Sequence, residues 1–175
     1  MKKITLSISA LVMLAFVSCG PTAKDAVAYN DNIMTIVNNV TLAQNDFFDQ
    51  TDGHNMDSLV LTLKTYSAKS KTGLDEINKL APFAEKREFL DAAVNFVKTL
   101  NALADNESKQ MVEIMTKDSA AVTEADVTKV EELSDKLNSE SEKVSKVIED
   151  AQTAFKNEWK FEIDATKQKS KKIIK

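Results

Sequence analysis

The chain has 175 residues with 23 basic and 27 acidic side chains, a formal net charge of −4, one cysteine and one histidine. This acidic balance argues against general binding to nucleic acid. A single cysteine excludes a framework of disulfide bonds. With only three glycines and two prolines, the chain has few helix breakers, so we expect long helices.

The first 18 residues have the layout of a secretory signal. Lys2 and Lys3 precede an apolar run from Ile4 to Val17, as in signal peptides. This run of about 14 residues is shorter than the roughly 20 that a helix needs to span a bilayer. We expect residues 1–18 to be removed, which leaves 157 residues, the size of one typical domain.

The end of the signal resembles the lipobox of bacterial lipoproteins at Phe16, Val17, Ser18 and Cys19. It departs from the commonest pattern, which has leucine in place of Phe16 and glycine or alanine in place of Ser18. The resemblance implies that Cys19 becomes the mature first residue and carries lipid. The alternative is an ordinary signal peptide, but a cut after Ser18 would put bulky Phe16 where signal peptidase prefers a small residue.

The ending Ser18-Cys19-Gly20 and the helical body resemble helical-bundle envelope lipoproteins of the Bacteroidota type. This resemblance implies a lipid-anchored protein of the cell envelope, on the outer membrane, at its periplasmic face or at the cell surface. Because two or more acyl chains hold a protein firmly where one binds marginally, a fully processed lipoprotein stays on its membrane.

Apolar residues recur at three- and four-residue steps over residues 24–50, which predicts a first amphipathic helix. The polar stretch 49–55 has turn chemistry, and Asn55 can cap a second helix over residues 56–80. That helix is weak where Ser70 and Gly73 replace large apolar side chains, and glycine costs about 1 kcal/mol of helix propensity relative to alanine. A close helix contact or a local break would explain this stretch.

Pro82 cannot continue a helix but suits the first turn of a new one, so we expect a corner there and a third helix over residues 83–116. After a polar loop, residues 123–126 resemble a capping box. A fourth helix is predicted from there to about Lys169, roughly 70 Å long at 1.5 Å per residue, so it should overhang or bend. Its core stripe has regular coiled-coil spacing: Val127, Val130, Ser134, Leu137, Ser141, Val144, Ile148, Ala151 and Phe155.

Four amphipathic helices with short corners predict an all-α fold, an antiparallel up-down-up-down four-helix bundle with a long C-terminal helix, preceded by a signal peptide. We divide the chain into a signal peptide (1–18), a lipid-attached spacer (19–23), the four-helix bundle (24–170) and a basic tail (171–175).

Six polar residues fall in or near the predicted core register. Bundle interiors can hold ligands, but buried polar residues also fix the register between helices, so both interpretations stay open. The six are Asn30, Gln44, Ser70, Glu107, Ser134 and Ser141.

The sequence offers little for catalysis, metals or cofactors. His54 lies in a turn near Asp52 and Asp57, but an EF-hand with Gly53 at its sixth position lacks acidic residues at its first and last positions. We find no nucleophile elbow and no phosphate loop. We therefore predict a solvated turn at His54, no metal, no cofactor and no enzymatic activity.

The end of the chain combines aromatic and basic residues. Trp159, Phe161 and Ile163 either pack against the open end of the bundle or form an exposed patch for a partner. Residues 165–175, which include the basic tail and are called the tail below, have no acidic residue. The tail either docks on an anionic membrane or is solvated and complements the helix dipole. Its cations are Lys167, Lys169, Lys171, Lys172 and Lys175.

Two triplets, Asp57-Ser58-Leu59 and Asp118-Ser119-Ala120, resemble the short acceptor for protein O-glycosylation in Bacteroidota-type envelopes. Such triplets also arise by chance. Ser119 is the better acceptor because we expect it in a loop.

These observations favour a lipid-anchored module of the cell envelope with an interaction or scaffolding role. Its expected partners are the membrane, through lipid on Cys19, and an unidentified protein, with no nucleic acid. The alternative is a ligand-binding helical bundle that uses the polar core positions.

Overall fold

The computed structural model describes residues 20–53 and 55–162. They form an all-α fold with no strand among them. The predicted signal peptide, Cys19, His54, Ile163 and the basic tail lie outside the described residues.

Four long helical segments make up the bundle. The first is α1 (Ala23–Thr51) and the second is α2 (Met56–Ile77). Both match the prediction closely, although α2 ends three residues before Leu80, where the prediction placed its end.

The third segment is interrupted by one wider turn. It consists of α3 (Glu88–Leu103), a π-helical turn η1 (Ala104–Ser108) and α4 (Lys109–Met115). A short 3-10 turn, η2 (Ser119–Ala121), leads to the fourth segment, α5 (Glu124–Trp159). The sequence pattern did not predict the π-helical turn.

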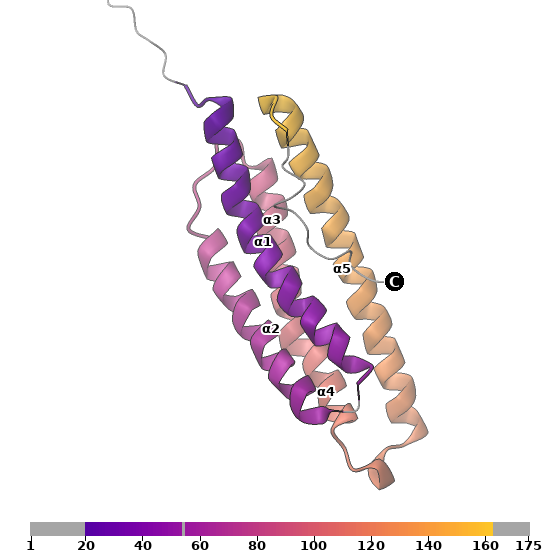
Figure 1. Ribbon diagram of the computed structural model, residues 1–175. Coiled ribbons are helices and arrows are strands. Elements are labelled where there is room, and N and C mark those ends of the chain that lie inside the picture. The colour runs from indigo at the N-terminus through magenta and orange to yellow at the C-terminus, as the bar shows by residue number, and fades with distance from the viewer. Residues whose placement is uncertain (1–19, 54, 163–175) are drawn as a thin grey trace, which may run out of the picture.

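Consecutive segments run in opposite directions, and each packs against the next, so the predicted antiparallel bundle is confirmed (Figure 1). The start of α1 and the end of α5 lie at the same end of the bundle. The corner between α1 and α2 and the loop before α5 lie at the other end. The chain therefore enters and leaves the described bundle at one end.

Side chains cap the helices where the chain changes direction. Asn55 Oδ1 accepts a hydrogen bond from Ser58 N at 3.0 Å, as predicted. Thr123 and Asp126 form the predicted capping box at the start of α5. A second capping box, which we did not predict, joins Thr22 and Asp25 at the start of α1. These bonds satisfy backbone N–H groups that the first turn of a helix leaves free.

Helix α2 is continuous through Gly73, where it packs closely against α1. A Cβ atom at this position would lie 2.8 Å from Val40 Cγ2 and 3.4 Å from Ile36 Cγ2. Of the two explanations given for this weak stretch, the close helix contact is therefore the correct one.

The predicted start of the third helix at Phe83 is wrong, because a tight turn comes first. Lys86 N donates to Phe83 O at 2.9 Å, and Ala84 and Glu85 have positive φ angles of 50° and 66°. The left-handed backbone of these two residues cannot be part of a right-handed helix, so α3 starts only at Glu88.

The predicted end of the fourth helix at Lys169 is also wrong. Helix α5 ends at Trp159, because Lys160 takes the left-handed conformation with φ 54° and ψ 48°.

The predicted core stripe of α5 is wrong near the start of the helix. Val127 was predicted to face the core but is 51% exposed, while Leu133, which was not part of the predicted stripe, is buried. The predicted core stripe therefore matches the buried face of α5 only from Leu137 onward.

Candidate functional site

Aromatic side chains from three helical segments and a loop gather at the end of the bundle where the described chain begins and ends. Tyr29 comes from α1, Phe83 from the turn before α3, and Phe89 from α3. Ring centroids are 5.2 Å apart for Tyr29 and Phe83 and 5.1 Å for Phe89 and Phe155 on α5. Such separations are typical of favourable aromatic pairs.

The last described residues fold back onto this aromatic cluster. The left-handed Lys160 reverses the chain after α5, and the centroid of Phe161 lies 5.9 Å from that of Phe155. Trp159 packs edge-on against Phe83 at 4.9 Å. Because Phe161 is buried and Trp159 is half-buried, these two residues fill the open end of the bundle and do not form the exposed patch considered for them.

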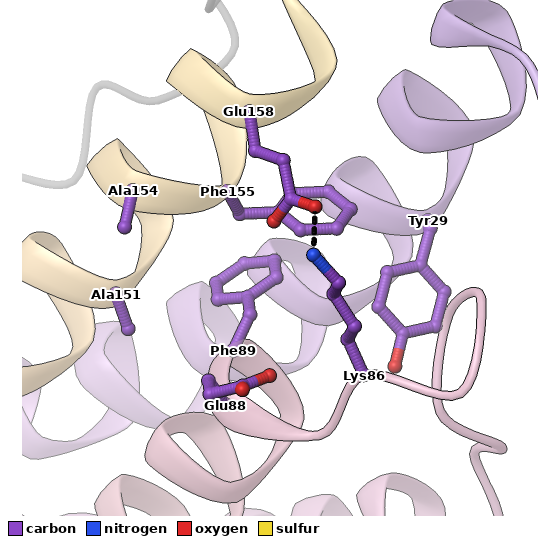
Figure 2. A pocket seen from close by; sticks show the side chains of 8 residues that line it. All are labelled: Tyr29, Lys86, Glu88, Phe89, Ala151, Ala154, Phe155 and Glu158. Carbon is purple, nitrogen blue, oxygen red and sulfur yellow. Dashed lines mark hydrogen bonds and ion pairs between the residues drawn. The ribbon is translucent and has the colours of Figure 1, made fainter.

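A pocket of about 240 Å³ opens beside the cluster (Figure 2). The rings of Phe89 and Phe155 form its apolar part, and the small side chains of Ala151 and Ala154 on α5 leave the space open. The remaining lining residues are Tyr29, Lys86, Glu88 and Glu158.

An ion pair between Lys86 and Glu158 crosses one side of the pocket (Figure 2). It joins the turn before α3 to the last part of α5. The hydrogen bond to Glu158 raises the pKa of Lys86. Burial raises the pKa of Tyr29, whose hydroxyl donates to Ala81 O at 3.0 Å. The pocket is therefore lined by one lysine, two glutamates and one tyrosine besides its apolar residues.

Four of the six predicted polar core residues are buried: Asn30, Gln44, Ser70 and Ser141. Three of them bond to other buried side chains. Gln44 Nε2 donates to Ser141 Oγ at 2.7 Å, and Gln152 Nε2 donates to Asn30 Oδ1 at 2.8 Å. Ser70 Oγ donates to Ser67 O at 3.0 Å.

The two bonds made by Gln44 and Gln152 both join α1 to α5, which are the first and last helices of the bundle. A buried amide needs a partner at a fixed position along the neighbouring helix. These bonds therefore join α1 to α5 at two defined positions, which is what a register-fixing role of the polar core would require.

Glu107 and Ser134 lie at the edge of the core and not inside it. Both are half-buried, and the Glu107 carboxylate pairs with Lys136 Nζ at 2.6 Å. Glu107 belongs to the π-helical turn η1, whose extra residue shifts the register that the sequence pattern assumed.

The sequence pattern missed three buried polar residues: Thr41, Ser108 and Gln152. Thr41 satisfies its hydroxyl by donating to Val37 O at 3.0 Å within its own helix. Gln152 directly follows Ala151, which the regular spacing assigned to the core. The spacing in the sequence could not show that Gln152 is buried, because its partner Asn30 lies on a different helix.

Ser119, the predicted modification site, lies exposed in the η2 turn. The Asp118 carboxylate accepts a hydrogen bond from Ala120 N at 2.9 Å and holds this turn. Ser58 in the other triplet is half-buried at the start of α2. The structure thus makes Ser119 the more accessible of the two hydroxyls.

Within residues 20–53 and 55–162, no three histidine, cysteine, aspartate or glutamate side chains are grouped so that they could hold a metal ion. None of the helices described there is both long and apolar enough to span a bilayer. Comparison of the chain with family models, with curated proteins and with solved structures gives no match.

Proposed function

We propose that this protein is a lipid-anchored helical module of the cell envelope, of the kind that the lipobox resemblance implies, and that it acts by binding a partner and not by catalysis. The observation that carries the proposal is the short distance along the chain between Cys19 and the bundle. Helix α1 begins at Ala23, and four residues of extended chain span at most about 14 Å. A lipid on Cys19 would hold the bundle close to the membrane.

The arrangement of the bundle then determines which of its two ends would face the membrane. The end of the bundle with the aromatic cluster also holds the start of α1 and the end of α5 (Figure 1), so this end would face the membrane. The opposite end, with the α1–α2 corner and the exposed η2 turn, would point away from it. A partner would reach the far end and the long sides of the bundle.

The alternative function, a ligand held by the polar core positions, has less support. Gln44 is bonded to Ser141, and Asn30 to Gln152. A ligand in the core would have to replace these bonds and displace packed side chains, which costs free energy because protein interiors are densely filled. We therefore favour an interaction or scaffolding role.

Mass spectrometry of the mature amino terminus tests the anchor. We expect an acylated Cys19 and no residues 1–18 in the protein purified from membranes, and loss from the membrane fraction after Cys19→Ser. Recovery of the protein with an unmodified Cys19 thiol in a soluble fraction would refute the proposal. Proximity labelling around the anchored protein and around the Cys19→Ser variant would then identify neighbours that depend on the anchor.

A further inference from the structure

The pocket beside the aromatic cluster exists because two neighbouring positions on α5 are alanine. Ala151 and Ala154 face the ring of Phe89 across the pocket (Figure 2). Ala154 is exposed, so a larger side chain there could extend over the opening. The space of about 240 Å³ exceeds the roughly 150 Å³ of an engineered apolar cavity in another protein that binds benzene. The pocket can therefore hold a ligand the size of one ring with a short side chain.

The apolar part of the pocket consists of aromatic rings. Phe89 and Phe155 lie with their planes 26° apart, and Tyr29 lines the pocket from α1. Both phenylalanines are nearly buried, with exposed fractions of 4% and 7%, so a ligand meets only the small part of each ring that lines the pocket. Aromatic rings offer apolar contact there, and an exposed ring face attracts a cation. An apolar body with a positive charge would use both properties.

The charges around the opening also favour a cation. Lys86 is paired with Glu158, and Glu88 adds a second carboxylate from the start of α3. The three ionic groups sum to one negative charge. Lys86, the cation that a ligand carboxylate could pair with, is already paired with Glu158, whereas an ammonium group could pair with Glu88.

We propose that this pocket binds a small organic cation, namely a primary ammonium group on an aromatic or apolar body. The body lies against Phe89 and Phe155 in the space above Ala151 and Ala154, and the ammonium group pairs with Glu88 or Glu158. This binding site goes beyond the proposed interaction role and does not depend on the lipid anchor.

The protein contains its own reporter for this site. Trp159 is the only tryptophan of the chain, and its ring centroid lies 6.4 Å from that of Phe155. A ligand that contacts Phe155 changes the surroundings of the indole. Titration of the full chain, followed by tryptophan fluorescence and by isothermal calorimetry, measures binding with two independent signals.

Three probes of similar shape separate the effect of charge from that of the ring: phenethylammonium, 2-phenylethanol and 3-phenylpropionate. Because exposed ion pairs and cation–π contacts each contribute modestly, we expect phenethylammonium to bind about three to ten times more tightly than the alcohol. The carboxylate should bind most weakly. The advantage of the cation should shrink as salt rises.

Two variants test the location. Ala154→Leu should extend over the opening of the pocket and weaken binding of phenethylammonium and 2-phenylethanol alike. The double variant Glu88→Gln and Glu158→Gln should keep binding of the alcohol and abolish the preference for the cation. The matched control is Glu131→Gln with Glu132→Gln, which changes the net charge equally near the other end of α5 and should leave the preference unchanged.

Equal affinity for the three probes would overturn the proposal. It would also be overturned if Ala154→Leu, with an unchanged circular dichroism spectrum, bound phenethylammonium as tightly as the unchanged protein. Loss of the cation preference in the Glu131 and Glu132 control to the same extent as in the Glu88 and Glu158 variant would also overturn it, because the effect would then come from net charge alone.

Discussion

Gln44 and Ser141 are 97 residues apart in the sequence and are joined by a hydrogen bond of 2.7 Å deep in the bundle. Both side chains are almost fully buried. Gln44 Nε2 is the donor, and no hydrogen-bond partner for Gln44 Oε1 is found among the described residues. The bond joins α1 to α5 inside the apolar core, so removing the Ser141 hydroxyl takes a hydrogen-bond acceptor away from a buried amide.

We expect Ser141→Ala to lower the free energy of unfolding by about 1 to 3 kcal/mol, because the amide of Gln44 then remains buried without its acceptor. Adding Gln44→Met, which keeps a similar length without polar atoms, should restore most of this loss. Urea denaturation of the two single variants and the double variant measures both effects. Ser139→Ala, at an exposed position on the same helix, is the control and should change stability little. A double variant less stable than Ser141→Ala alone would contradict this account.

Gly73→Ala should destabilise the bundle although alanine is the better helix former. Helix propensity favours alanine by about 1 kcal/mol, but the new Cβ atom would lie 2.8 Å from Val40 Cγ2. Because overpacking a filled core typically costs about 1 to 3 kcal/mol, we expect a net loss of about 1 kcal/mol. The double variant with Val40→Ala should cost less than the sum of the single variants. A more stable Gly73→Ala protein in thermal melts would show that α1 and α2 are less closely packed than described.

Asp126 should make stability depend on acid pH. The hydrogen bond from Lys117, followed by those from the backbone and hydroxyl of Thr123, lowers the pKa of Asp126 from 3.8 to about 2. A lowered folded-state pKa stabilises the protein above the unfolded value, so this contribution is present above about pH 4 and is lost as the pH falls towards 2. Urea unfolding between pH 2 and 5 should show a smaller loss for Asp126→Asn than for the unchanged protein.

Lys117→Gln provides the matched comparison for Asp126. It removes the ion pair with Lys117 Nζ at 2.6 Å but keeps the hydrogen bonds that the backbone N–H and the hydroxyl of Thr123 donate to the Asp126 carboxylate. Its dependence on pH should therefore lie between those of the unchanged protein and Asp126→Asn. Identical pH profiles for all three proteins would contradict the assigned role of this carboxylate.

Local signals in the sequence were sufficient for much of the fold. Asn55 and Thr123 are capping residues whose chemistry acts within one turn, so the starts of α2 and α5 were predictable. The end of α5 was not, because Ile163 continues the four-residue spacing of Phe155 and Trp159. Only the aromatic cluster, built from residues far apart in the sequence, shows that Phe161 turns back to pack on Phe155.

The same limit applies to the candidate site. The pocket depends on Ala151, Ala154, Phe89 and the Lys86–Glu158 ion pair. No spacing in the sequence connects the turn before α3 with the end of α5. Asn30 and Gln44 were recognised as core positions because they interrupt an apolar stripe, but their partners could not be assigned without the helix register.

The basic tail should bind an anionic membrane, and its place in the chain supports this expectation. Helix α5 ends at Trp159, at the same end of the bundle as the start of α1 (Figure 1). The first tail lysine, Lys167, follows that end by eight residues.

A chain that begins at Gly20 keeps the capping box of Thr22 and Asp25 and removes the lipid, so it isolates the effect of the tail. Each lysine near an anionic leaflet contributes about 1 kcal/mol, and salt screens this attraction beyond a Debye length of about 8 to 10 Å. We expect weak binding to phosphatidylglycerol vesicles at low salt in sedimentation assays, with loss at high salt and after replacement of the five tail lysines by glutamine. Equal binding to phosphatidylcholine and phosphatidylglycerol vesicles, or no binding to either at low salt, would show instead that the tail is only solvated.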